Sequence, residues 1–137
     1  MSNPKRNETY RVTIHGEPAS KANSRRSVLI GGKPRFIKSK KALGYAKDFE
    51  KQCPVKNPLL EGDVFVACKV WYRTRRPDLD VSLILDLLES KVYQNDRQVR
   101  RMFLDHGIDR DDPRAEIVVL PIEQSFTWET LWESNAS

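Results

Sequence analysis

Two periods in the spacing of apolar residues predict the elements of this 137-residue chain. An alternation of apolar and polar positions, which is typical of a half-buried strand, occurs at residues 9–15, 62–72, 98–106 and 114–122. Two short apolar pieces joined by a pair of glycines predict a hairpin over residues 28–37. Strands therefore account for most of the predicted regular structure.

Helical spacing of apolar residues occurs in two further segments. Ser39 is a suitable N-cap for a helix that continues to about Gln52, and Pro54 prevents its extension. A leucine-rich segment predicts a second helix that ends near Ser90, with Asp80 as its N-cap or a first-turn residue. The order of strand, hairpin, helix, strand, helix and two strands predicts an α+β fold with a small mixed sheet and two main helices.

Length and pattern together predict a single folded domain. A chain of 137 residues can bury a sizeable core without disulfides or structural zinc. We assign the domain to residues 9–122, after a flexible N-terminus at 1–8 and before a C-terminal tail at 123–137. Two tryptophans and a leucine in the tail have helical spacing, which is more typical of a packing helix than of a partner-binding peptide.

Composition indicates a soluble protein of a reducing compartment. Hydrophobic residues make up 39% and charged residues 31% of the chain, and no apolar run is long enough to span a membrane. No signal-peptide pattern is present at the start of the sequence. Cys53 and Cys68 lack metal-ligand spacing, so we expect two ordinary reduced thiols and a cytoplasmic location.

The charge is unevenly distributed along the chain. The net charge is +5, but residues 1–76 contain 18 Lys and Arg against 6 Asp and Glu, whereas residues 77–137 contain 6 against 13. No acidic residue occurs between Glu17 and Asp48, where nine basic residues lie. Such a segment is either a solvated surface or, as its complete lack of acids favours, a phosphate-binding surface. The expected contacts to nucleic acid are Lys21, Arg25, Arg26, Arg35, Arg73, Arg75 and Arg76.

Carboxylates follow directly after the second arginine cluster. Asp78 and Asp80 lie in an extended segment, where residues two apart project to the same side. Packed like charges favour a bound cation, and hard oxygen ligands with no nearby His or Cys favour Mg²⁺ or Mn²⁺. Asp96 lies in a polar turn beyond the leucine-rich helix. Taken separately, the Asp78–Asp80 segment is often just a helix cap, and Asp96 is often just part of a turn. Taken together, and preceded by a cluster of arginines, these aspartates predict a metal site that faces phosphate.

This arrangement resembles the RusA family of Holliday junction resolvases, many of which phages and prophages encode. The similarity lies in RRPDLD, LILDLL and NDRQV, and in an opening loop with Gly16, Pro18 and Lys21; it covers about residues 9–122, and its aspartate segment is specific. The resemblance implies a small mixed α/β fold and a homodimer that cuts two strands of a four-way DNA junction with Mg²⁺ or Mn²⁺. It also implies that Asp78, Asp80 and Asp96 are the catalytic metal ligands.

Three positions depart from the family's pattern. Val81 stands where the family usually has Asn, Ile84 stands near the place of a catalytic Lys, and Asn95 replaces the first acid of a pair. Asn can still coordinate a metal through its carbonyl oxygen. The missing cation would then come from elsewhere, and the candidates are Lys21, Lys69 and Lys91. Asp86 lies six residues after Asp80, and we expect it at the surface or behind the ligands.

The sequence therefore predicts a metal-dependent, structure-selective endodeoxyribonuclease that cuts four-way junctions in recombination and repair. We expect a homodimer that binds branched DNA, does not associate with membranes, and lies in the cytoplasm with the nucleoid. One alternative is a non-catalytic branched-DNA-binding protein of the same fold, for which Val81, Ile84 and Asn95 are the reasons. The other is a nuclease for a different branched substrate.

Overall fold

The structure is a computed structural model, and it describes residues 9–19, 25–77 and 79–123, with the backbone alone at 25–28 and 34–38. The predictions for residues 1–8 and for the tail at 124–137 lie outside the described residues. The strands are β1 (Tyr10–His15), β2 (Arg25–Ile30), β3 (Lys33–Lys38), β4 (Val64–Tyr72), β5 (Val99–Ile108) and β6 (Arg114–Pro121). The helices are α2 (Lys40–Gln52), α3 (Ser82–Leu88) and the short 3-10 helix η2 (Asp96–Gln98). The predicted order of elements and the α+β class are confirmed.

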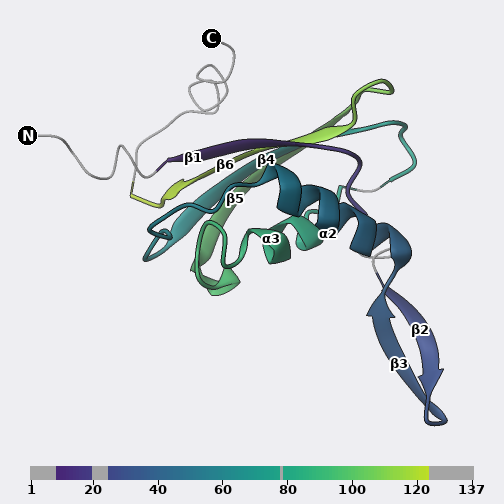
Figure 1. Cartoon of the computed structure of the whole chain (residues 1–137). Helices are drawn as coiled ribbons and strands as arrows, with labels where there is room; N and C mark the ends of the chain where they lie inside the picture. Colours follow the sequence, from purple (N-terminus) through teal and green to yellow (C-terminus); the bar gives the residue numbers. More distant parts are fainter. Residues whose placement is uncertain (1–8, 20–24, 78, 124–137) are drawn as a thin grey trace, which may run out of the picture.

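Four strands form one mixed sheet in the order β1-β6-β4-β5. β4 is parallel to β5 and antiparallel to β6, and β6 is antiparallel to β1 (Figure 1). A parallel pair needs a crossover connection, and α3 lies in the segment that connects β4 to β5. The candidate carboxylates of the sequence all fall in this crossover.

The core lies between the sheet and the two helices, which lie on the same face (Figure 1). The predicted alternation of β4 is confirmed, since Val66, Cys68 and Val70 face this core while Phe65 and Ala67 form a smaller cluster on the other face. From the helices the core receives fully or nearly fully buried side chains, namely Ala42, Tyr45, Phe49, Leu83, Ile84 and Leu88.

Local signals set the helix ends, with one difference from the prediction. Ser39 caps α2 as predicted, because its hydroxyl accepts a hydrogen bond from the Ala42 N–H at 3.2 Å. The second helix is shorter than predicted, since it begins at Ser82 and ends at Leu88. Ser90 has φ 71°, a left-handed conformation that an α-helix cannot contain. At the other end the N-cap is Val81, so Asp80 is neither the N-cap nor a first-turn residue and precedes the helix.

The β2–β3 hairpin, residues 25–38, is a separate two-stranded sheet that we call the arm. It projects away from the four-stranded sheet (Figure 1). Gly31 and Gly32 have φ of 60° and 78°, as a two-residue turn with two left-handed positions requires. Leu29 and Ile30, beside that turn, are 77% and 57% exposed. The arm thus carries an apolar tip on a basic stem.

Both cysteines are buried and free, and we expect neither to react in the folded protein. Burial raises the pKa of the Cys68 thiol to about 12 and also raises that of Cys53, so at about pH 8 almost no reactive thiolate is present. A chromogenic disulfide reagent should detect no thiol in the native protein and two per chain in denaturant. Rapid reaction of one native thiol would contradict this burial.

In the described part of the chain, no helix has the length and apolar character needed to cross a membrane.

Candidate functional site

Asp80 is held at the end of β4 by hydrogen bonds on both sides. Its backbone N–H donates to the Tyr72 hydroxyl at 3.3 Å, which ties the crossover to the last residue of β4. Its Oδ1 accepts hydrogen bonds from the Ser82 N–H, at 3.0 Å, and from the Ser82 hydroxyl. The carboxylate is therefore oriented before any ligand binds, and it is half-buried rather than free in solvent.

Glu17, which the sequence analysis did not single out, lies at the same end of β4. Its Oε2 accepts a hydrogen bond from the Arg73 N–H at 2.8 Å, and its Oε1 is 3.6 Å from Lys41 Nζ. Burial raises the pKa of the Tyr72 hydroxyl, the hydrogen bond from the Asp80 N–H lowers it, and the negative charges of Asp80 and Glu17 raise it. Glu17 and Asp80 therefore lie at the same end of β4, Glu17 against the Arg73 N–H and Asp80 against the Tyr72 hydroxyl.

The predicted polar turn at Asn95 and Asp96 is a hydrogen-bonded cap. The Asn95 Oδ1 accepts from the Arg97 N–H at 2.9 Å, and the Gln98 Oε1 accepts from the Asn95 N–H at 3.0 Å. The Gln98 amide also donates to the carbonyl of Leu60 at 2.9 Å, which anchors the turn to the chain before β4. This network places Asp96 on an exposed, fixed turn directly before β5.

The negative charges of three further acids act on Tyr93. This residue is buried, and its hydroxyl donates to the Leu85 carbonyl at 2.9 Å. Burial raises the pKa of Tyr93, and the charges of Asp96, Glu89 and Asp86 raise it further. Asp86, which was expected at the surface or behind the metal ligands, is exposed and shares the neighbourhood of Asp96.

The acids of the crossover thus lie near two different tyrosines, one before and one after α3. Asp80 precedes the helix and lies near Tyr72, whereas Asp96 follows it and lies near Tyr93. Asp78 lies outside the described residues, and among those described no three His, Cys, Asp or Glu side chains form a group able to hold a metal ion. The donor chemistry, carboxylates without His or Cys, fits a hard cation. The convergence of Asp78, Asp80 and Asp96 stays a prediction.

The arginines predicted to contact phosphate lie in two places. Arg73, Arg75 and Arg76 are exposed and follow β4 directly, beside the segment that carries Asp80. Arg25, Arg26 and Arg35 belong to the strands of the arm, and Lys21 lies outside the described residues. Basic residues therefore flank Asp80 and also extend along a projecting hairpin.

Two of the three lysines proposed to replace the family's lysine have other partners. Lys91 Nζ is 2.8 Å from Glu50 Oε2, so it connects the end of the crossover to α2. Lys69 Nζ lies 4.8 Å from the centre of the Trp71 ring, on the sheet face opposite the helices. Ile84 is fully buried in the core, where an ammonium group would be costly. The third candidate, Lys21, lies outside the described residues, so the source of the missing cation stays a prediction.

The sequence was also compared with known proteins and protein families. No curated protein matches the chain at a significant level. The family described as Endodeoxyribonuclease RusA matches residues 15–120, which is well over half of the chain. The matched span includes the arm, the arginines after β4, and both ends of the crossover that carry Asp80 and Asp96. The protein belongs to the RusA endodeoxyribonuclease family, whose members act on Holliday junctions.

Proposed function

We propose that this nuclease hydrolyses phosphodiester bonds of four-way DNA junctions with Mg²⁺ or Mn²⁺ as its cofactor. Membership of the family supports the reaction class and the substrate. The observation that carries the proposal for this chain is the Asp80 carboxylate, which Ser82 and Tyr72 orient next to an exposed arginine cluster. An oriented oxygen ligand beside groups that bind phosphate is what metal-assisted hydrolysis requires.

In this proposal Asp78, Asp80 and Asp96 bind the metal, and Glu17 is a further oxygen donor at the Asp80 end. A divalent cation bound there would stabilise charge on the scissile phosphate and lower the pKa of a bound water. Ser82 and Tyr72 hold Asp80 in place, which reduces the reorganisation needed on binding.

The arginines after β4 are proposed to hold the substrate backbone. Arg73, Arg75 and Arg76 are exposed, and guanidinium groups bind phosphate oxygens with paired hydrogen bonds. Their attraction also offsets the repulsion between DNA and the carboxylates. Selectivity for a branched substrate then depends on the placement of phosphates rather than on base edges.

A cleavage assay on synthetic DNA tests the function. With Mg²⁺ or Mn²⁺ the protein should cut a four-way junction in two symmetry-related strands, and should leave the matched linear duplex and all reactions with EDTA intact. Paired cuts are expected because we propose a symmetric homodimer.

Two other outcomes would replace the proposal. Junction binding without incision under either metal would favour the non-catalytic protein, which the buried Ile84 and the cap formed by Asn95 motivate. Faster cutting of a flap than of a four-way junction would favour a nuclease for another branched substrate.

A further inference from the structure

β5 is an edge strand with unusually exposed apolar side chains. In the described part of the chain, β4 is the one strand that pairs with it, and this leaves the outer edge of β5 without a strand partner. The exposed side chains include Met102 at 43%, Phe103 at 39%, Leu104 at 38% and Ile108 at 46%. Edge strands of this kind readily pair with another chain unless they are covered or charged. The edge therefore has the character of an interaction surface.

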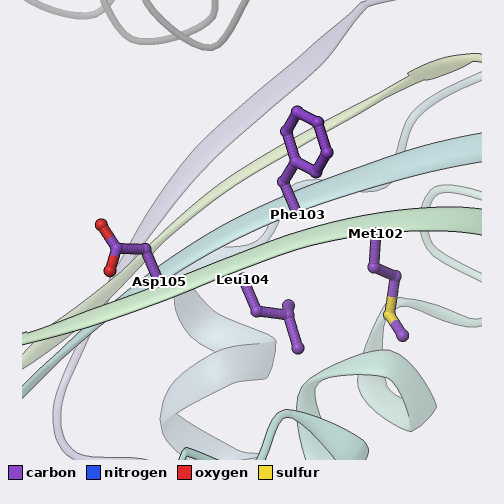
Figure 2. A pocket seen from close by; sticks show the side chains of 4 residues that line it. All are labelled: Met102, Phe103, Leu104 and Asp105. Atoms are coloured by element: carbon purple, nitrogen blue, oxygen red, sulfur yellow. The ribbon is translucent and has the colours of Figure 1, made fainter.

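The side chains of β5 are divided between the two faces of the sheet. Met102 and Leu104 extend to one side of the strand, whereas Phe103 and Asp105 extend to the other (Figure 2). These four residues line one surface pocket. Phe103 packs edge-on against Phe65, with ring centres 5.0 Å apart, so its position on the strand is well defined. A partner must match an apolar pair on one face and an aromatic and charged set on the other.

A second copy of β5 supplies that match. In an antiparallel pair related by a two-fold axis through Phe103, Arg101 lies opposite Asp105 of the second copy, and Met102 lies opposite Leu104. Opposed residues share a face in such a pair, so an arginine meets a carboxylate and an apolar side chain meets another. The axis repeats each contact, and Phe103 meets its own equivalent.

Charge selects this register over its neighbours. Asp105 is the one acidic residue of β5. Moving the axis to Met102 or to Leu104 removes its pairing with Arg101, because the opposed positions then shift by two residues. Arg100 is already paired with Asp63 at 2.9 Å, whereas no ion pair among the described residues includes Arg101 or Asp105.

We infer that β5 is the homodimer interface and that it pairs antiparallel with β5 of a second copy about an axis at Phe103. The pairing joins the two four-stranded sheets into one continuous sheet. It satisfies the backbone groups at the outer edge of β5 and brings Met102, Phe103 and Leu104 against side chains of the second copy. The inference does not depend on catalysis, and its tests use neither DNA nor metal.

A charge swap tests the partner. Arg101→Asp alone places two carboxylates opposite each other, and Asp105→Arg alone places two guanidinium groups there. We expect each single variant to raise the dimer dissociation constant at least about tenfold, and the double variant to return it to within about threefold of wild type. Sedimentation equilibrium of the 15.9 kDa chain measures the constant. Lys47→Glu, an exposed change of the same size on α2, should leave it unchanged.

A cysteine scan tests the register. Phe103→Cys places two thiols opposite each other at roughly 5 Å, and mild oxidation should form a disulfide between copies. Leu104→Cys places its two thiols two positions apart, roughly 8 Å, which is too far for that bond. Cys53 and Cys68 are buried and should not compete.

Three experimental results would contradict β5 pairing as the homodimer interface or its register. A monomeric mass at all concentrations rejects β5 as the interface. A dimer dissociation constant that changes in neither Arg101→Asp nor Asp105→Arg rejects it as well. Cross-linking at Leu104→Cys but not at Phe103→Cys rejects the register. The charge swap and the cysteine scan change different residues, so a variant that fails to fold in one set leaves the other to decide.

Discussion

Asp80→Asn should abolish junction cleavage while leaving junction binding intact or stronger. The substitution keeps the size of the side chain and an oxygen that can accept the Ser82 hydrogen bonds, but removes the negative charge needed to hold a divalent cation. Loss of several kcal/mol of transition-state stabilisation corresponds to a decrease in cleavage rate of roughly 10³-fold or more. Single-turnover cleavage and a mobility-shift titration on the same junction measure the two effects separately.

Matched variants identify the cause of that loss. Asp111→Asn makes the same chemical change at an exposed position of the β5–β6 turn and should leave cleavage unchanged. Ser82→Ala removes a hydroxyl that orients Asp80 and should lower the rate less than Asp80→Asn does, because the carboxylate itself remains. If Asp80→Asn lost binding and cleavage to the same extent, with its melting temperature unchanged, the metal-binding role of Asp80 would be wrong.

Neutralising the arm should produce the second large effect, a loss of DNA affinity without a loss of fold stability. Glutamine is substituted at the five basic residues of the arm, Arg25, Arg26, Lys33, Arg35 and Lys38. Each phosphate contact contributes about 0.9 to the slope of log affinity against log salt, so five substitutions should lower the slope by up to about 4.5 and the affinity by about 10²-fold or more. Binding titrations between low and physiological salt measure both quantities.

The apolar tip provides a separate test within the same arm. Leu29→Ser with Ile30→Ser keeps every basic residue, so it should leave the salt slope unchanged even if affinity for the junction falls. The thermal midpoint of all arm variants should stay close to wild type, since no core residue identified among the described side chains comes from β2 or β3. A neutralised arm with an unchanged salt slope would exclude it as a phosphate-binding surface.

Features that depend on neighbouring residues could be predicted from the sequence. The alternation of β4, the cap at Ser39 and the glycine turn of the arm all follow from local sterics and hydrogen bonding, and each is confirmed. The boundary of α3 was less accurate because Glu89 is already extended and Ser90 is left-handed, and neither residue type gives much sign of those conformations.

Features that depend on strand order could not be predicted in the same way. Glu17 and Asp80 lie at the same end of the sheet because β1 and β4 both pair antiparallel with β6. The segments that follow β1 and β4 are therefore close in space although they are far apart in the sequence. The pattern of residues 98–106 indicated a half-buried strand, yet most of β5 is exposed because it lies at the sheet edge. Alternation identifies a strand but does not identify its neighbours.

The arm has an evolutionary consequence. A hairpin whose described side chains supply nothing to the core can gain, lose or exchange residues through mutation while the rest of the molecule continues to fold. Selection can therefore change how the arm binds DNA without affecting the residues that stabilise the sheet and the crossover. Related chains should vary more in length and composition across this projection than across β4.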